Sequence, residues 1–366
     1  SRPRGGALMG PHRGLPTDPL DPAGRAPGAD ALLEVSDLVK HFPIRAGLLG
    51  RPVGAVRAVD GVSFDVRRGE ALGIVGESGC GKSTTARMML RLLEPTSGSI
   101  RMEGRDIAHL SRRELKPLRR EMQMVFQDPY SSLNPRKTVG SIIGEPFAIH
   151  GVEPDADARR RAVRELMDLV GLNPEHYNRH PHEFSGGQRQ RIGVARAIAL
   201  RPKLLIADEP VSALDVSIQA QILNLLSELR RELGLTLVLI AHDLSVVRHM
   251  CDRVAVMYLG KVVELAEGDA LYARPRHPYS GALLSAVPVP DPELARSRER
   301  QVLGGDVPSP SAPPAACRFH TRCPRFVPGH CDVDEPLLEA RGGDGVVACH
   351  YPLDGGEPAA RAPSAA

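Results

Sequence analysis

The sequence has no tryptophan, few aromatic residues and no long apolar run. Aromatic residues make up only 4% of the 366 positions, which argues against a surface that binds nucleic acid by stacking on its bases. A net charge of +3 is too small to suggest a dedicated polyanion binder. No apolar stretch approaches the ~18–20 residues that cross a bilayer, and the N-terminus lacks the apolar segment of a signal peptide. We therefore expect a globular, cytosolic chain that does not bind nucleic acid and meets a membrane only through a partner.

The composition changes along the chain. Residues 1–29 are rich in proline, glycine and arginine without periodicity, so they are predicted to be disordered, as is the tail at 353–366. Between about residues 30 and 274, apolar runs of strand length alternate with amphipathic helical patterns. This alternation predicts an α/β sheet. From about 275 to 352 proline becomes dense and four of the six cysteines gather, which indicates a separate small extension.

A glycine-rich stretch follows the apolar run at 71–75. It reads Gly76-Glu77-Ser78-Gly79-Cys80-Gly81-Lys82-Ser83-Thr84. This sequence fits the G-x-x-x-x-G-K-[ST] pattern of a phosphate-binding loop, and the strand before it and the helical pattern after it are the context that the motif requires. Backbone N–H groups of such a loop close around phosphate oxygens, helped by the dipole of the following helix. Lys82 can reach the β- and γ-phosphates, and Ser83 can bind Mg²⁺. The alternative is a chance glycine-rich turn.

Another apolar run, at 203–207, ends in two adjacent carboxylates, Asp208 and Glu209. Asp208 is placed to hold Mg²⁺, and Glu209 is placed to polarise an attacking water or accept its proton. The alternative is an acidic pair at the surface end of a strand.

Two further candidates carry weaker signals. Ser185-Gly186-Gly187-Gln188 precedes a helical pattern, so its hydroxyl and backbone N–H groups can bind an anion, although the same residues can simply cap a helix. Phe42, in the first strand pattern, can stack on an adenine ring, and an equal alternative is a core or edge-strand phenylalanine.

Taken together, these residues resemble the nucleotide-binding subunit of ABC transporters, over about residues 32–285. The shared elements follow the order of the family: the phosphate loop, the loop at Gln127, the signature 185–188, the strand ending at Glu209, Ser212-Ala213-Leu214-Asp215, and His242 after a strand. The resemblance implies a P-loop NTPase domain at 30–274, with a RecA-like core, an antiparallel β subdomain and a helical subdomain at about 128–184.

The resemblance also implies roles for single residues. ATP would lie between the phosphate loop of one subunit and the signature of another, in a head-to-tail dimer, with Asp215 in the nucleotide-binding set. Glu209, His242 and Gln127 would form the catalytic group. Mg²⁺ would be held by Ser83, Gln127 and Asp208, while Gln127 would also couple to membrane subunits. A phosphate loop without a facing signature leaves the γ-phosphate open to water, so we expect weak hydrolysis by the chain alone.

Several stretches are more similar to the peptide and nickel importer branch of this family. They lie at 126–136, 179–188, 212–221, 277–279 and 286–290, and the insertion after Phe42 is similar to that of the F-type second ATPase of dipeptide and oligopeptide importers. This implies an import motor peripheral to the cytoplasmic face of the plasma (inner) membrane. Its partners would be a second, different ATPase subunit, two transmembrane permease subunits and an extracytoplasmic solute-binding protein.

Two alternatives to peptide import stay open. One keeps the motor and changes the cargo to nickel or another small solute, because the ATPase does not touch its cargo. The other is a soluble ABC ATPase acting on ribosomes or DNA. Such proteins usually carry two fused nucleotide domains or a long coiled coil, whereas this chain has one of each motif and no sustained heptads.

Four cysteines in the extension form the last candidate site: Cys317, Cys323, Cys331 and Cys349. Disulfides are uncommon in the cytosol, and zinc prefers cysteines in closely spaced pairs, which are missing here. Four thiolates also suit a [4Fe–4S] cluster, and the extension resembles that of importers which carry such a cluster. The sequence therefore predicts an iron–sulfur cluster, with zinc or free thiols as alternatives.

Overall fold

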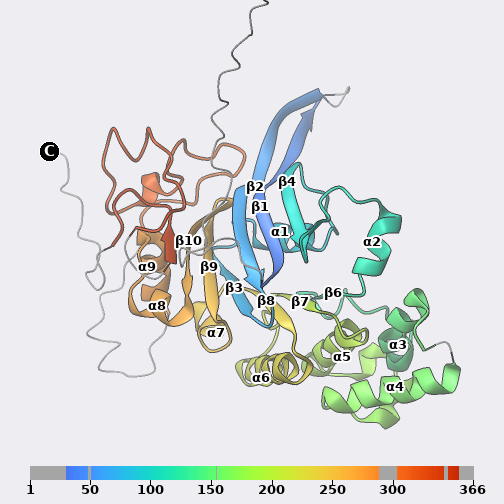
Figure 1. Cartoon of the computed structure of the whole chain (residues 1–366). Helices are drawn as coiled ribbons and strands as arrows, with labels where there is room; N and C mark the ends of the chain where they lie inside the picture. Colours follow the sequence, from blue (N-terminus) through green and yellow to red (C-terminus); the bar gives the residue numbers. More distant parts are fainter. Residues whose placement is uncertain (1–29, 48–50, 154, 288–302, 342–344, 354–366) are drawn as a thin grey trace, which may run out of the picture.

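The computed structural model describes residues 30–47, 51–153, 155–287, 303–341 and 345–353 (Figure 1). The disorder predicted for 1–29 and for almost all of 353–366 lies outside these residues. Within the described ranges, no helix combines the length and the apolar character that a bilayer crossing needs.

A seven-stranded sheet forms the centre of the molecule, in the order β11-β10-β9-β3-β8-β7-β6. Its strands are β3 (Ala71–Val75), β6 (Met122–Val125), β7 (Leu204–Asp208), β8 (Thr236–Ala241), β9 (Arg253–Tyr258), β10 (Lys261–Glu267) and β11 (Gly345–Val347). The strands from β9 to β6 are parallel, and β10 and β11 are antiparallel. Every residue of β3, β7 and β8 is buried, which is why these strands read as continuous apolar runs. The predicted α/β fold is confirmed.

The two faces of this sheet belong to two apolar cores. Side chains alternate along a strand, so Ala71 and Val75 enter one core while Leu72 and Ile74 enter the other. The first core is shared with residues of seven helices: α3 (Val139–His150), α4 (Ala156–Leu169), α5 (Gly186–Ile198), α6 (Val216–Leu233), α7 (Leu244–Arg248), α8 (Gly268–Ala273) and α9 (Pro278–Ser285). The second core is shared with α1 (Lys82–Met89) and α2 (Arg112–Leu118), and with a second sheet.

That second sheet is antiparallel, with the order β2-β1-β4-β5. Its strands are β1 (Ala31–Ala46), β2 (Arg51–Arg67), β4 (Ser97–Met102) and β5 (Arg105–Asp106). The pairing of β1 with β2 runs from Ala31 opposite Arg67 to Ala46 opposite Arg51. The insertion expected after Phe42 therefore prolongs a hairpin (Figure 1).

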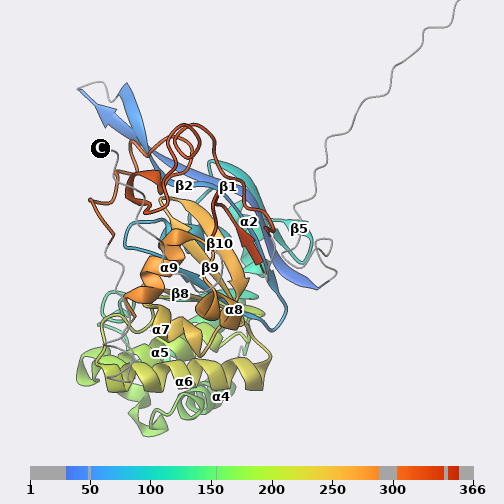
Figure 2. The ribbon, with the colours of Figure 1, turned by 90° about the vertical axis from the view of Figure 1, so that its left-hand side faces the viewer.

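A helical region lies between β6 and β7. It contains α3 (Val139–His150), α4 (Ala156–Leu169) and the 3₁₀ turns η1 (Pro174–Asn178) and η2 (Pro181–Glu183), and it leads into α5. Asp155 caps α4 by accepting a hydrogen bond from the N–H of Ala158 at 2.8 Å. Helices α4, α5 and α6 gather at the end of the molecule away from the tip of the β1–β2 hairpin (Figures 1 and 2).

The C-terminal extension shares the core of the main sheet. Its strand β11 pairs with β10, with Val347 opposite Glu264. Phe319, which precedes the 3₁₀ turn η3 (His320–Arg322), is 1% exposed and belongs to the same core as Tyr258 and Tyr279. The extension lies beside β9 and β10 in both views (Figures 1 and 2). The extension therefore packs into the main core, although its composition had suggested a separate appendage. The exact division of the chain into domains stays a prediction.

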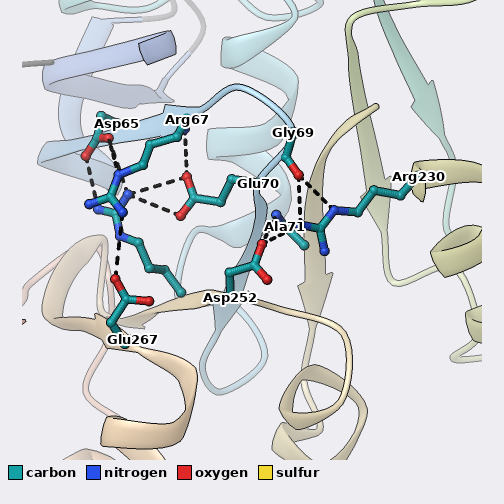
Figure 3. Close-up of polar contacts among 9 residues, drawn as sticks. Asp65, Arg67, Gly69, Glu70, Ala71, Arg230, Asp252 and Glu267 are labelled. Atoms are coloured by element: carbon teal, nitrogen blue, oxygen red, sulfur yellow. Dashed lines mark hydrogen bonds and ion pairs between the residues drawn. The ribbon is translucent and has the colours of Figure 1, made fainter. Parts of the chain in front are cut away.

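A polar network joins the starts of β3 and β9 (Figure 3). Arg253 is 2% exposed and contacts two carboxylates, Glu70 at 3.2 Å and Asp65 at 3.0 Å. Beside it, Asp252 accepts from the N–H of Ala71 at 2.8 Å and from Arg230 of α6 at 2.5 Å. This network fixes the strand that leads into the phosphate loop.

Candidate active site

The predicted site residues follow the ends of four adjacent parallel strands. The loop at 76–81 follows β3, His242 follows β8, Asp208 and Glu209 end β7, and Gln127 follows β6. Because the carboxyl ends of parallel strands meet at one edge of a sheet, these segments lie in a row, as in other α/β ligand sites.

The phosphate loop has a backbone that only glycine permits at two positions. Gly76 and Gly81 have φ values of 152° and 109°. A Cβ atom would lie 2.2 Å from the carbonyl oxygen of Met257 at Gly76, and 2.3 Å from that of Ala58 at Gly81. Gly81 is the N-cap of α1, so the loop delivers its backbone N–H groups at a helix N-terminus, where an anion is stabilised. Inside the loop, the Cys80 thiol is 4% exposed, and burial raises its pKa.

Lys82 and Ser83 are the first residues of α1, and the side chains of both are hydrogen-bonded. Lys82 is 4% exposed, and its Nζ donates to the carbonyl oxygens of Gly76 at 2.8 Å and Glu77 at 3.2 Å. Ser83 Oγ donates to Asp208 Oδ1 at 2.8 Å. Burial raises the pKa of Asp208, although the hydrogen bond from Ser83 acts in the opposite direction. A hydroxyl and a buried carboxylate side by side are oxygen ligands of the kind that Mg²⁺ takes beside nucleotide phosphates.

Glu209 is held by the two other predicted catalytic residues. Gln127 Nε2 donates to Glu209 Oε2 at 2.8 Å, and His242 Nδ1 lies 3.7 Å from the same oxygen. The backbone of Glu209 has a φ of 44°, and its N–H donates to the carbonyl oxygen of Ile240 on β8 at 3.0 Å. The structure thus brings Gln127 and His242 next to the carboxylate of Glu209. The role of this carboxylate as a general base stays a prediction.

Other predicted residues lie apart from this group. Ser185 begins α5 as a capping box: its Oγ accepts from the N–H of Gln188 at 3.3 Å, and Gln188 Oε1 accepts from the N–H of Ser185 at 3.0 Å. Asp215 is exposed at the N-cap of α6. Phe42 is 38% exposed on β1, with Lys40 Nζ 5.2 Å from its ring centroid. Among the described residues, neither the signature nor Asp215 is hydrogen-bonded or ion-paired to the phosphate loop, so their roles stay predictions.

The four cysteines of the extension are free and partly or fully buried. The N–H of Cys317 donates to the carbonyl oxygen of Cys331 at 3.2 Å. Burial raises the pKa of Cys323 and Cys349 to about 12, and the neighbouring cysteines add to the shift. In the described part of the chain, no group of three or more His, Cys, Asp or Glu side chains is arranged to hold a metal ion. The predicted iron–sulfur cluster and its zinc alternative are therefore not supported.

Sequence patterns missed one contact of the phosphate loop. The carboxylate of Glu77 pairs with Arg322 of the extension, with Nη1–Oε2 at 2.8 Å and Nη2–Oε1 at 3.2 Å. The N–H of Glu77 donates to the hydroxyl of Tyr279 on α9 at 2.8 Å. Arg322 lies 245 positions from Glu77, and no local pattern relates residues so far apart.

Two family models match the chain. One, described as "ABC transporter", matches residues 59–212, and another, described as "Oligopeptide/dipeptide transporter, C-terminal region", matches residues 263–331. Among solved structures, the dimeric post-hydrolysis structure of the ATP-binding cassette MJ0796 with ADP and Pi is similar at a TM-score of 0.58 and 29% identity, over 64% of this chain and 98% of that one. The cbiO1 structure from Clostridium perfringens has a TM-score of 0.57 at 30% identity, over 67% and 91% of the two chains. The fold and site are those of an ATPase cassette.

Curated relatives extend over most of the chain. The oligopeptide transport ATP-binding protein AppF of Bacillus subtilis (strain 168) is 56% identical over 326 residues, which cover 89% of this chain and 98% of that protein. The probable peptide ABC transporter ATP-binding protein y4tS of Sinorhizobium fredii is 55% identical over 339 residues, 92% of either chain. The chain belongs to the family of ABC transporter ATP-binding proteins.

Proposed function

We propose that this chain is the ATP-hydrolysing subunit of a membrane importer for dipeptides or oligopeptides. The observation that carries the proposal is that the catalytic carboxylate Glu209, held by Gln127 and His242, occurs in a chain whose extension matches the peptide-transporter C-terminal family. The relatives named for oligopeptide or peptide transport support the same cargo class.

The hydrolytic role follows from the placement of each side chain. The loop N–H groups and Lys82 would bind the phosphates. Ser83 and Asp208 would hold Mg²⁺, which would neutralise phosphate charge when bound. Glu209 accepts a proton as water attacks the γ-phosphate. Gln127 donates to Glu209 at 2.8 Å and so orients the carboxylate, while His242 stands beside it to contact the γ-phosphate.

The signature at 185–188 supports a dimer. Because these residues are not bonded to the chain's own phosphate loop among the described residues, they are available to a facing subunit. The partners in the proposal are a second ATPase subunit in a head-to-tail heterodimer, two transmembrane permease subunits and an extracytoplasmic solute-binding protein. The complex would hold this chain at the cytoplasmic face of the plasma membrane, and hydrolysis by the chain alone would be weak.

A finer part of the proposal is a [4Fe–4S] cluster on Cys317, Cys323, Cys331 and Cys349. A cluster takes one thiolate on each iron, so its ligands need not converge on a single point as they do around zinc. The chemistry of four thiols in one short segment supports it, although no metal-binding group is found among the described residues. Iron and acid-labile sulfide should be measured in anaerobically purified protein. A folded extension without either would eliminate the cluster.

Transport assays test the main proposal. Cells lacking the chain should lose uptake of labelled dipeptides or oligopeptides, and the wild-type chain should restore it while Lys82→Ala should not. Loss of nickel uptake with unchanged peptide uptake would keep the motor and change the cargo. Cells with no transport defect would favour the soluble ATPase alternative.

A further inference from the structure

The phosphate loop contains a negative charge at its second residue. Glu77 directly follows Gly76, and its side chain is 27% exposed. The nucleotide that this loop binds is a polyanion, so an uncompensated carboxylate here would oppose binding through Coulomb repulsion, more strongly because the site is partly removed from water. Glu77 therefore needs a positive partner.

The extension supplies that partner. Arg322 makes two parallel contacts with the Glu77 carboxylate at 2.8 and 3.2 Å, and its side chain is only 7% exposed. A bidentate arginine–carboxylate pair is both stronger and more directional than a single contact. The guanidinium also contacts Tyr258, with Nη1 3.4 Å from the hydroxyl and Cζ 5.9 Å from the ring centroid, and Nε has no hydrogen-bond partner among the described residues. Glu77 is thus the only charged partner of Arg322 in that part of the chain.

Packing fixes the position of Arg322. Phe319, three residues earlier, lies in an aromatic cluster with Tyr258 and Tyr279, with ring centroids 4.7 to 5.4 Å apart. Tyr279 also accepts the backbone N–H of Glu77. The cluster therefore contacts the main chain of Glu77 directly through Tyr279, and its side chain indirectly through Arg322, which contacts Tyr258.

The extension approaches the loop at a second place. Residues 307–310 line one pocket together with Ser78, Gly79 and Cys80. The carbonyl oxygen of Pro310 accepts from the N–H of Arg57 on β2 at 2.9 Å. Residues 307–310 of the extension thus lie across this pocket from the phosphate loop, while Ser78 and Gly79 stay exposed.

We propose that Arg322 is a positioning residue which neutralises Glu77, so that the C-terminal extension sets the affinity of the phosphate loop for nucleotide. This inference rests on the proposed ATPase function and deepens it. Because coupling between two sites is reciprocal, nucleotide on the loop must in turn stabilise the segment around Arg322.

The test measures binding of Mg²⁺ and a non-hydrolysable ATP analogue to the full chain by calorimetry. Arg322→Gln keeps the length of the side chain and removes its charge, so the dissociation constant should rise about tenfold, within the usual range of such coupling. Adding Glu77→Gln removes the bare carboxylate and should bring the dissociation constant back to within about twofold of wild type. Arg325→Gln is the matched control, because Arg325 lies in the same segment but donates to the carbonyl oxygen of Pro352. Its affinity should match that of wild type.

Rescue separates the inference from a general loss of structure. If Arg322→Gln acted only by loosening the extension, Glu77→Gln would not restore binding, and the inference would be overturned. Unchanged affinity in Arg322→Gln would overturn it as well. If Arg322→Gln does not fold, amide hydrogen exchange of the wild-type chain provides an independent test. Binding of the ATP analogue should slow exchange at 317–323. An unchanged exchange rate there would contradict the coupling. A wild-type chain that binds no analogue would instead refute the ATPase function itself.

Discussion

Gln127 and Glu209 meet across the ends of β6 and β7, with Nε2 donating to Oε2 at 2.8 Å. The two residues are 82 positions apart, and the parallel pairing of their strands places them together. The amide donates to only one of the two carboxylate oxygens. An amide donor at this point orients Glu209, the proposed base, without adding charge to the site.

Glu209→Gln should abolish hydrolysis and leave ATP bound. The amide keeps the shape of the side chain but cannot accept a proton, and loss of a general base typically lowers turnover about 10²- to 10⁴-fold. Phosphate release and retained nucleotide should be measured on the assembled ATPase subunits. Glu232→Gln, an exposed carboxylate on α6, is the control and should turn over normally. Unchanged turnover in Glu209→Gln would contradict the assignment of the base.

Gln127→Ala should lower kcat about tenfold with little change in the KM for ATP. The substitution removes the hydrogen bond that orients Glu209, and hydrogen bonds to charged groups contribute about 1.5–3 kcal/mol. Gln127 touches no residue of the phosphate loop among the described contacts, so ground-state binding should persist. A rise in KM at constant kcat would instead favour the role of Gln127 as a ligand of Mg²⁺, which the family resemblance implies.

Ser83→Ala should weaken ATP binding only when Mg²⁺ is present. The hydroxyl is a proposed ligand of the ion and bonds Asp208 at 2.8 Å, and loss of one such group typically costs about 10- to 100-fold in metal affinity. Titrations with Mg²⁺ and with a chelator should differ for wild type and converge for the variant. Ser227→Ala, at an exposed position of α6, should retain the difference. Equal loss with and without Mg²⁺ would show that Ser83 acts through the loop backbone.

Local motifs predicted which residues meet at this edge of the sheet, because the phosphate loop, Gln127, Asp208–Glu209 and His242 each lie at or just after the end of a strand. Glycine spacing, the Asp208–Glu209 pair and the apolar runs are all visible within a few residues, and parallel pairing then brings Gln127, Glu209 and His242 together. The features that the sequence did not predict depend on contacts between distant segments. Periodicity within a strand does not reveal its partner, so residues 43–56 looked like an insertion, although 43–46 and 51–56 pair within the β1–β2 hairpin.

The extension shows the same limit. Its proline-rich composition suggested an appendage, yet β11 completes the main sheet and Arg322 reaches Glu77. The buried charge of Arg253 was also hidden, because a lone arginine in an apolar run does not disclose the carboxylates that neutralise it.

His277 should make the stability of the extension dependent on pH. It is fully buried, and burial lowers its pKa to about 3 from the ordinary 6.5. His277 therefore binds a proton in the unfolded chain but stays neutral in the folded chain, so the free energy of unfolding falls as the pH drops below about 6.5. From about pH 7.5 to about pH 5.5 the loss should be about 1.4 kcal/mol.

The control for this pH effect is His277→Asn, which can still cap α9 by accepting from the N–H of Tyr279. Glu264 accepts the backbone N–H of His277 at 2.9 Å, and burial raises its pKa, so it acts in the opposite sense in both chains. The difference in unfolding free energy between wild type and variant should therefore follow the histidine alone. Urea unfolding at several pH values measures it, and parallel pH profiles would refute a neutral buried histidine.

Arg253→Met should destabilise the fold by about 3–5 kcal/mol, because it leaves Glu70 buried without its partner. Glu70 is 6% exposed, and burial already raises its pKa. Adding Glu70→Gln removes the unpaired buried carboxylate and should recover most of the lost stability. Arg68→Met is the surface control: it removes a pair with Glu103 at 2.5 Å in which both side chains are well exposed, so the change should stay below about 1 kcal/mol. Chemical unfolding of the wild type and the three variants measures these free-energy changes. Equal effects of Arg253→Met and Arg68→Met would show that burial of the Arg253–Glu70 pair does not increase its contribution to stability.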